Sequence, residues 1–382
     1  MYSVYAFGTM ITDKVRAPAY ETAMRQVIQP GAVVVELGAG TGAFSILACR
    51  LGARHVYAIE TNPAVAIARE SAAANGYGDR ITVLDRVSTS VDLPEKADVL
   101  VSDLRGTMPL YGQHIPSIID ARTRLLRSDG VQIPQRDELW VGLVHDEAAH
   151  HELTGPWTAF DLDLTAARRF AVNSMQARRV AAENLVAQPS CWATLDYRTI
   201  EHPSVAGTAK WQISEPATVD GLSLWFTAHV LEGISYSTSP ADPETVYGAT
   251  FLPLAEQVKL GAGDCVEVKL RADLVAGDYV WSWYTEVHTN AGVHSMRQSS
   301  FLAAPPPLAG LPKRAEMAEP EPTDRARAAA LALRLLDGQH TLGSIADDLM
   351  TSFATAFRTR AVALKFAADL AERYASWRPE HR

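Results

Sequence analysis

A glycine-rich turn with an acidic residue two positions before it is the most informative chemical feature of the chain. Residues 35–42 read VELGAGTG, with the spacing E-x-G-x-G-x-G. Glycines at a strand-to-helix turn let a ligand approach the backbone closely. A dinucleotide site instead uses the spacing G-x-G-x-x-G, which binds a pyrophosphate. Glu36 would repel a pyrophosphate, but it could hold an ammonium group. The spacing therefore indicates a nucleoside that carries an amino-acid group and no phosphate, such as S-adenosylmethionine (SAM).

A second carboxylate, Glu60, closes the apolar run that begins at His55. It follows the glycines by about 20 residues, the distance at which nucleotide-binding sheets place an acid that hydrogen-bonds the ribose hydroxyls. Glycine turns and acids at strand ends are each common, so a turn that binds nothing is the alternative. The two features in this order favour a SAM site.

Alternating strand and helix patterns surround these residues. A helix is predicted at residues 19–28, ended by Pro30-Gly31. Short apolar runs bounded by turn residues are typical of buried parallel strands. The predicted strands are 32–37, 55–60, 81–85 and 98–102, and the predicted helices between them are 43–51 and 64–75. This alternation predicts an α/β fold with a doubly wound, Rossmann-like sheet over residues 1–136.

The second half of the chain changes to the period-2 alternation of antiparallel strands. Residues 137–304 predict an antiparallel β-barrel or sandwich, with an Ala- and Arg-rich helical excursion at about 163–184. A Pro-rich linker follows at 305–324, and residues 325–382 have the helical periodicity of a small separate domain. Its predicted helices are 326–336, 345–353 with Thr341 as N-cap, and about 360–377.

The composition fits a folded protein with a net negative charge. The 382 residues carry 35 Lys and Arg against 44 Asp and Glu, a net charge of −9, which argues against wrapping nucleic acid as the main role. Cys49, Cys191 and Cys265 are far apart and the histidines lack ligand spacing, so no disulfide scaffold or metal site is expected. No signal peptide or membrane-spanning run is visible, and a cytoplasmic protein is the expectation.

Further motifs accompany the glycine turn. Asp13-x-x-Arg16 precedes it, GA-x-x-VYAIE occupies 52–60, and Asp98-x-x-x-Ser102-Asp103 follows. The second half contributes AFDL at 159–162, G-x-x-x-WF at 221–226 and ST-x-P at 237–240. Together, over roughly residues 5–300, these motifs resemble the protein arginine methyltransferases, which have the class I SAM-dependent methyltransferase fold. The resemblance implies methyl transfer from SAM with S-adenosylhomocysteine (SAH) as product, and a homodimer formed through the helical excursion.

The resemblance also implies a role for each residue of the donor site. Arg16 would pair with the SAM carboxylate, and Glu36 with the glycine turn would hold the amino-acid portion. Glu60 would bind the ribose, and the backbone at 86–88 would border the adenine. The cofactor-binding residues implied are Arg16, Glu36, Gly38, Ala39, Gly40, Thr41, Gly42, Glu60, Thr61, Arg86, Val87 and Ser88.

The loop that would hold the acceptor departs from the family pattern. The resemblance places two glutamates there, which grip a guanidinium, whereas this chain has Asp103 at the first position and Gly112 at the second. Arg105 adds a positive charge that would repel a cationic acceptor. The family's Thr-His-Trp motif reads Thr-Val-Tyr at 245–247, so its histidine is absent. We therefore expect a retained donor half and a remodelled acceptor half.

The residues left to contact an acceptor lie in or just after this loop. Asp103 and His114 are the candidates to remove a proton from the nucleophile. The alternatives are a carboxylate that only pairs with Arg105 and a histidine with no role in the reaction. Arg105 would suit an acceptor that carries a carboxylate or another anionic group. The predicted substrate contacts are Asp103, Arg105, Tyr111 and Gln113.

The segment 335–346 is similar to small winged-helix modules of the PqqD type, which bind leader peptides. A helical appendage that packs on the barrel or supports oligomerisation is the alternative. We expect a SAM-dependent methyltransferase that modifies a nitrogen or oxygen nucleophile of a peptide or peptide-derived substrate, with no membrane or nucleic-acid partner. The alternatives are a protein arginine methyltransferase with a degenerate loop and a SAM-binding regulator without turnover.

Overall fold

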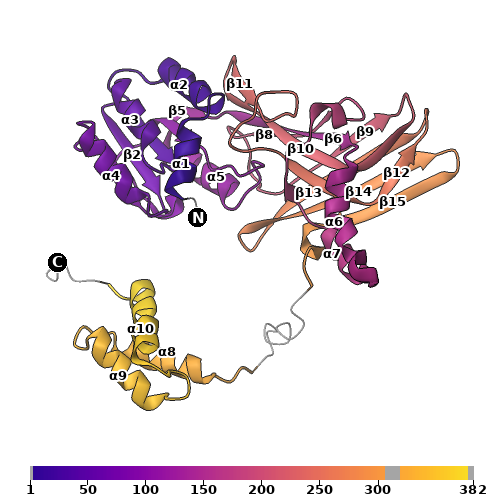
Figure 1. Cartoon of the computed structure of the whole chain (residues 1–382). Helices are drawn as coiled ribbons and strands as arrows, with labels where there is room; N and C mark the ends of the chain where they lie inside the picture. The colour runs from indigo at the N-terminus through magenta and orange to yellow at the C-terminus, as the bar shows by residue number, and fades with distance from the viewer. Residues whose placement is uncertain (1–2, 306–318, 377–382) are drawn as a thin grey trace. The chain divides into compact units, whose positions relative to one another are not determined.

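The computed structural model describes residues 3–305 and 319–376 (Figure 1). The chain divides after Pro305 into two units, which are described separately. The larger unit contains one parallel and two antiparallel sheets, and the smaller unit contains helices. No helix among the described residues is long and apolar enough to cross a membrane.

A five-stranded parallel sheet forms the first half of the larger unit, in the order β3-β2-β1-β4-β5. Its elements are β1 (Val33–Leu37), α3 (Ala43–Arg50), β2 (His55–Glu60), α4 (Val65–Ala74), β3 (Ile81–Asp85), η1 (Ser88–Ser90), β4 (Ala97–Ser102), α5 (His114–Arg124) and β5 (Leu126–Ile133). All of β1 is buried, as in a strand covered on both faces. The predicted doubly wound fold is confirmed. Because the strand order reverses at β1, a ligand site is expected at the carboxyl ends of β1, β2 and β4.

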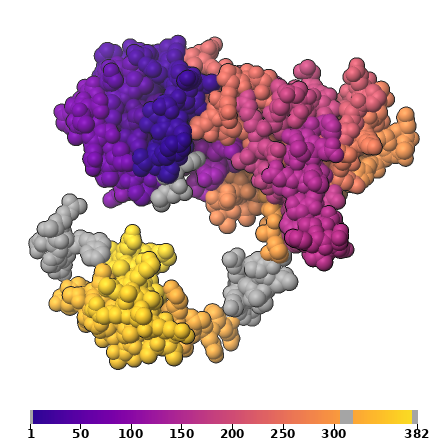
Figure 2. Space-filling model, viewed as in Figure 1, coloured from indigo at the N-terminus to yellow at the C-terminus, as the bar shows by residue number. Residues whose placement is uncertain are grey.

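Two helices precede this sheet, α1 (Val4–Ile11) and α2 (Arg16–Val27). The sequence did not predict α1 and predicted α2 only from residue 19. Helix α2 begins earlier because Oδ1 of Asp13 accepts hydrogen bonds from the N–H groups of Val15 and Arg16, both at 2.8 Å. The N-terminal segment, dark indigo in Figure 2, covers part of the sheet domain on the face shown.

The predicted antiparallel barrel follows and is built from two sheets, of orders β7-β12-β10-β6-β8, with β11 beside β10, and β15-β14-β13-β9. The strands are β6 (Arg136–Val144), β7 (Gln176–Ala177), β8 (Ser190–Asp196), β9 (Val205–Gln212), β10 (Ala217–Leu231), β11 (Ile234–Ser237), β12 (Thr250–Leu260), β13 (Cys265–Val275), β14 (Asp278–Thr289) and β15 (Gly292–Ser299), and η4 (Ser300–Leu302) ends the unit. Trp281 and Trp283 of β14 are buried core residues.

A helical excursion leaves the barrel between β6 and β7 and stands out as a protrusion in Figure 2. Its elements are α6 (Glu147–Thr154), η2 (Gly155–Asp161) and α7 (Thr165–Ala171), with η3 (Ala182–Asn184) after β7. The excursion starts before the predicted residue 163 because Asp146 caps α6 by accepting the N–H of Ala149 at 2.8 Å. Phe160 lies in η2 and is 91% exposed.

The smaller unit has the three helices that the sequence predicted: α8 (Asp324–Leu335), α9 (Leu342–Ser352) and α10 (Arg360–Tyr374). The hydroxyls of Thr323, Thr341 and Thr359 cap them by accepting backbone N–H groups. Residues 319–376 contain no strand, so the similarity to PqqD-type winged-helix modules stays a prediction. Residues 306–318 of the predicted linker and the predicted end of the last helix at Trp377 lie outside the described residues.

Candidate functional site

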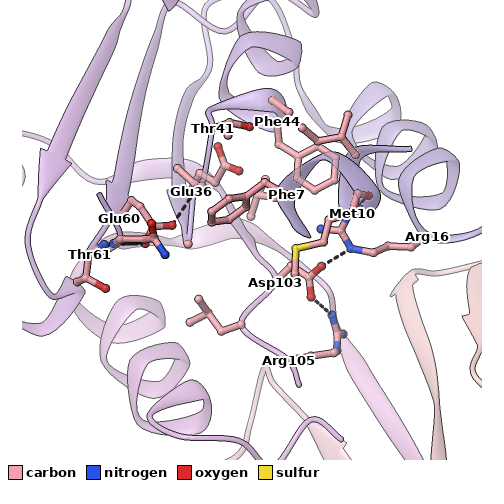
Figure 3. Close-up of a pocket in the computed structure, with 18 of the residues that line it drawn as sticks. Phe7, Met10, Arg16, Glu36, Thr41, Phe44, Glu60, Thr61, Asp103 and Arg105 are labelled. Carbon is pink, nitrogen blue, oxygen red and sulfur yellow. Dashed lines mark hydrogen bonds and ion pairs between the residues drawn. The ribbon is translucent and has the colours of Figure 1, made fainter. Parts of the chain in front are cut away.

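A cavity of about 500 Å³ opens at the carboxyl ends of β1, β2 and β4 (Figure 3). This is the place at which the strand order reverses. Its walls come from α1, the starts of α2 and α3, the three strand ends with the loops that follow them, and a loop of the barrel. The lining residues are Phe7, Met10, Ile11, Arg16, Glu36, Gly38, Ala39, Gly40, Thr41, Ala43, Phe44, Glu60, Thr61, Asn62, Val101, Asp103, Leu104, Arg105, Tyr111 and Tyr247.

The glycine turn forms a tight cradle on the donor side of this cavity. Gly38 and Gly40 have φ angles of +73° and +54°, which side chains rarely adopt. A Cβ at Gly38 would lie 2.6 Å from Cδ2 of Leu104, and one at Gly40 would lie 2.7 Å from the ring of Phe7. The cradle therefore requires glycine at both positions. Its backbone faces the cavity, as a site for a closely held ligand demands.

Glu60 and the glycine turn, which the sequence separates, are in direct contact. Oε2 of Glu60 accepts the N–H of Gly40 at 2.7 Å, and Oε1 accepts the N–H groups of Thr61 and Asn62, both at 2.7 Å (Figure 3). The backbone thus fixes the carboxylate at the end of β2. Each oxygen of a carboxylate has two acceptor positions, so Oε2 keeps one for a ligand hydroxyl.

Glu36 is a buried acid whose one side-chain partner among the described residues is Ser45, which donates its hydroxyl to Oε2. Burial raises the pKa of Glu36 to about 8, with the charge of Glu60 adding to the effect and the Ser45 hydrogen bond opposing it. A buried carboxylate of this kind gains from a cationic partner. An ammonium group in the cavity would supply one, as the sequence predicted.

Arg16, Asp103 and Tyr247 form a hydrogen-bonded cluster across the cavity from Glu60. Nε of Arg16 donates to Oδ2 of Asp103 and to the hydroxyl of Tyr247, the latter at 3.0 Å, and Tyr247 also donates to Oδ2. Nη1 of Arg16 donates to the carbonyl of Met10 at 3.0 Å. Nη2 of Arg16 donates no hydrogen bond to any described residue, so it is available to the carboxylate of a ligand.

Asp103 lies between two guanidinium groups, those of Arg16 and Arg105 (Figure 3). Burial alone would raise the pKa of Asp103, but Arg16, Arg105 and the Tyr247 hydrogen bond outweigh burial and lower it. Asp103 is therefore ionised at neutral pH. It is suited to accepting a hydrogen bond from an acceptor group rather than to taking a proton from one.

Arg105, predicted from the sequence to bind an anionic acceptor, is instead engaged by hydrogen bonds within the protein. Nε and Nη2 donate to Oδ2 and Oδ1 of Asp137 at 2.7 and 2.8 Å, and Nη1 donates to the hydroxyl of Tyr20 at 2.7 Å and to Asp103 at 3.0 Å. These bonds use four of the five N–H donors of a guanidinium. Arg105 lines the cavity but is only 3% exposed, so little of its guanidinium is left to contact an anion.

His114 does not reach the cavity, contrary to the prediction that it removes a proton from the acceptor. It begins α5, is 2% exposed, and its Nδ1 lies 2.5 Å from the carbonyl of Pro109. Burial and the charge of Arg105 lower the pKa of His114 to about 4, so the ring is neutral at physiological pH. Gln113 is also outside the lining, whereas Tyr111 lines the cavity and is 54% exposed.

Some of the remaining predicted cofactor-binding residues line the cavity, and others do not. Gly38, Ala39, Gly40, Thr41 and Thr61 line the cavity, whereas Gly42, Arg86, Val87 and Ser88 do not. The role of residues 86–88 toward adenine stays a prediction.

Several lining residues were not assigned to the site from the sequence. Phe7, Met10 and Ile11 belong to α1, which carried no recognised helix signal. Ala43 and Phe44 follow the predicted segment that ends at Gly42, and Asn62 follows Thr61. Proximity in the sequence could have found these three residues.

Comparisons with known proteins agree with this site. A family model described as ribosomal protein L11 methyltransferase (PrmA) matches residues 8–130. Protein arginine N-methyltransferase 6 of Xenopus laevis is 27% identical over 267 residues, 66% of this chain and 78% of that protein. An arginine N(omega)-methyltransferase of Streptomyces achromogenes subsp. streptozoticus is 30% identical over 274 residues, 68% of this chain and 74% of that protein.

The fold is similar to that of a solved arginine methyltransferase. The Trypanosoma brucei PRMT1 enzyme–prozyme heterotetrameric complex with AdoHcy has a chain that aligns with a TM-score of 0.71. The alignment covers 77% of this chain and 96% of that one, at 22% identity. At this identity the likeness concerns the fold.

Proposed function

The chain belongs to the SAM-dependent methyltransferase family of the protein arginine methyltransferases, and on that premise we propose that it methylates a nitrogen or oxygen nucleophile of a peptide or peptide-derived substrate. The cofactor is SAM, and the product is SAH. The proposal concerns the acceptor, which we infer to be an uncharged group rather than a guanidinium. The support for it is the engagement of Asp103 by Arg16, Arg105 and Tyr247.

The donor half of the cavity fits SAM group by group. Nη2 of Arg16 is available to the carboxylate, the buried Glu36 gains from the ammonium, and Glu60 keeps an acceptor position for a ribose hydroxyl. The glycine turn lines the cavity, and a Cβ at Gly38 or Gly40 would collide with the side chain of Leu104 or Phe7. When bound, SAM supplies a methyl group on a positively charged sulfur.

The acceptor half has too little free negative charge to hold a guanidinium by a carboxylate pair. The acids of the lining are Glu36, Glu60 and Asp103, and the first two are on the donor side. Arg16 and Arg105 balance Asp103, and Asp137 balances Arg105. An uncharged nucleophile costs less to desolvate in such surroundings than a cation does.

The residues of this half would act by positioning the nucleophile. One position on Oδ1 of Asp103 remains able to accept an N–H or O–H of the acceptor. That hydrogen bond would aim the lone pair of the nucleophile at the donor side. The displaced proton would leave to solvent, because the lowered pKa of Asp103 makes it a weak base.

Transfer of labelled methyl from SAM tests the proposal. The purified full chain is incubated with free arginine, an arginine-rich peptide and a lysate of the source organism, and the products are separated into polypeptide and small-molecule pools. Label in a polypeptide at a position other than a guanidino nitrogen, located by mass spectrometry, is the expected result. Label on arginine guanidino nitrogens at a turnover matching the lysate acceptor would contradict it.

Arginine methylation is the second candidate, and the names of the relatives are the observation that favours it. Gly112 offers a sharp test, because a Cβ there would meet nothing within 4 Å, although its φ is +47°. Gly112→Glu adds the missing second carboxylate, and Gly112→Gln has the same backbone strain without the charge. If arginine is not the natural acceptor, Glu should create arginine methylation and Gln should not. A regulator without turnover is not favoured, because the chain belongs to an enzyme family.

Self-association and peptide delivery belong to the same proposal. The excursion exposes Phe160, Leu162 and Leu164, an apolar segment that suits burial against a second copy of the chain. Sedimentation of the wild type and of Phe160→Asp tests the homodimer.

The smaller unit, by its similarity to leader-binding modules, would hold the peptide. Removal of residues 306–382 should then raise the KM for a peptide acceptor while leaving SAH affinity unchanged.

A further inference from the structure

Tyr247 reaches the centre of the acceptor half from the barrel. It lies in the loop between β11 and β12, is 8% exposed and lines the cavity. Its hydroxyl donates to Oδ2 of Asp103 and accepts from Nε of Arg16 at 3.0 Å. One phenol thus touches both the residue expected to bind the SAM carboxylate and the only acidic lining residue on the acceptor side.

The ring of Tyr247 is held firmly in this position. It packs edge-on against Phe226, with ring centroids 5.4 Å apart, and lies parallel to Tyr236 at 6.4 Å. The neighbouring N–H of Val246 donates to Oδ2 of Asp13 at 2.7 Å. Oδ1 of Asp13 also accepts the N–H of Arg16, the first residue of α2, so the barrel loop and α2 share one anchor.

The loop is also pinned on its other side. Nη2 of Arg179 donates to the carbonyls of Ser239, Pro240 and Asp242. The position of the Tyr247 hydroxyl is therefore determined by the packing on both sides of the loop, and the hydroxyl cannot swing away without breaking these contacts.

The hydroxyl uses the part of Asp103 that a guanidinium needs. A guanidinium binds a carboxylate through two parallel N–H···O bonds, one to each oxygen. Oδ2 of Asp103 already accepts from Arg16 and Tyr247, which fills both of its positions, and Oδ1 accepts from Arg105. When the hydrogen bonds from the described residues are counted, the Asp103 carboxylate has one free acceptor position, on Oδ1.

We propose that the Tyr247 hydroxyl determines acceptor specificity, by occupying the Asp103 oxygen that a guanidinium requires and leaving one position for an acceptor that donates a single hydrogen bond. The inference rests on the proposed function, since it explains how an arginine methyltransferase fold selects an uncharged nucleophile. Tyr247 acts through Asp103 and is a positioning residue.

Tyr247→Phe keeps the ring and removes the hydroxyl, and so frees one position on Oδ2. Tyr236→Phe is the matched control. Tyr236 is a buried neighbour stacked on Tyr247, and its hydroxyl has no hydrogen-bond partner among the described residues. The two variants delete the same atom from parallel rings, and only one of them changes Asp103.

The experiment measures binding of agmatine, a small guanidinium probe, to the SAH-loaded full chain by calorimetry. Tyr247→Phe should bind agmatine about tenfold more tightly than the wild type, and Tyr236→Phe should match the wild type within about twofold. SAH affinity should be unchanged in Tyr236→Phe. Because Tyr247 also contacts Arg16, SAH affinity is measured separately in Tyr247→Phe and every variant is saturated with SAH before agmatine is added. A destabilised variant would bind agmatine more weakly, so tighter binding of agmatine by Tyr247→Phe cannot result from general destabilisation. Tyr247→Leu, which also lacks the hydroxyl, should shift agmatine affinity in the same direction.

Equal agmatine affinity in Tyr247→Phe and the wild type would overturn the inference, as would an equal gain in Tyr236→Phe. The proposed function fails by a different result, namely methylation of arginine by the wild type. In that case the sign of the Tyr247→Phe effect still decides the inference, because a loss of guanidinium affinity on removing the hydroxyl would contradict it.

Discussion

Arg105 and Asp137 join the acceptor loop to the first strand of the barrel through two parallel hydrogen bonds, at 2.7 and 2.8 Å. Both side chains are fully excluded from solvent, and Tyr197 donates its hydroxyl to the same carboxylate. The pair fixes the loop that carries Asp103 against the barrel. It also neutralises the charge that, in the sequence, suggested an anionic acceptor.

Asp137→Asn should destabilise the protein strongly, because it leaves the Arg105 guanidinium buried without its main anion. Removing one partner of a buried pair costs about 3–5 kcal/mol, and we expect a loss near the lower value in the free energy of urea unfolding. The exposed pair Arg54–Glu95 supplies the control, and Glu95→Gln should have a far smaller effect. Similar losses in the two variants would mean that the buried pair is not a structural anchor.

Glu36 should make SAH binding depend on pH. Its pKa of about 8 in the folded chain lies above the ordinary value of 4.5, so the ligand-free protein retains a proton that the unfolded chain has lost. The free energy of unfolding of the ligand-free protein should therefore fall as the pH rises from about 4.5 to 8. An ammonium beside Glu36 favours the ionised form, so binding releases that proton and becomes tighter as the pH rises.

Calorimetric titration of SAH at pH 6 and pH 8.5 checks this linkage. The wild type should bind SAH at least about tenfold more tightly at pH 8.5 than at pH 6. Glu36→Gln should bind more weakly and with little pH dependence. A steep pH dependence retained in Glu36→Gln would assign the proton to another group.

The donor half of the site was predictable because its signals are local. The glycine turn and Glu36 fall within eight consecutive residues. Glu60 ends the next strand of a regular α/β alternation, and parallel strands bring their carboxyl ends to one edge. Pattern and spacing therefore suffice to place these groups together.

The acceptor half was not predictable in the same way, since its contacts join distant segments. Arg16 and Tyr247 are 231 positions apart in the sequence, and the barrel packing alone brings them together. Asp137 lies between two other charged residues, Arg136 and Glu138, at the start of its strand, so nothing local marked it as the partner of Arg105. Without that partner, Arg105 resembles a free cation in the loop, and for this reason the sequence alone suggested an anionic acceptor.

His114 should influence stability at acid pH rather than the pH profile of the reaction. Its pKa of about 4 lies below the ordinary value of 6.5, so the unfolded chain binds a proton that the folded chain does not between these values. The free energy of unfolding should therefore fall by up to about 3 kcal/mol as the pH drops from 6.5 to 4. Urea unfolding across this range should show a smaller fall in His114→Asn. If the pH–rate profile of the wild type shows an ionisation near pH 6.5 that His114→Asn lacks, His114 takes part in the reaction after all.

Gly40→Ala should impair cofactor binding beyond the cost of its backbone. At φ +54°, a side chain costs about 1–2 kcal/mol, and its Cβ would lie 2.7 Å from the ring of Phe7. The ring belongs to α1, which has no buried residue, so we expect α1 to shift rather than the turn. Because Phe7, Met10 and Ile11 form one wall of the cavity, that shift should weaken SAH binding at least about tenfold.

Gly233→Ala separates the two effects, since Gly233 also has a positive φ of +75° but an added Cβ would meet nothing within 4 Å. It should lower the melting temperature about as much as Gly40→Ala and leave SAH affinity unchanged. Combining Gly40→Ala with Phe7→Ala should remove the clash while keeping the backbone strain. Because Phe7 also forms part of the cavity wall, the double variant is compared with Phe7→Ala alone. Weaker SAH binding in the double variant than in Phe7→Ala would show that the ring of Phe7 is not the obstacle, and that the turn itself had been distorted.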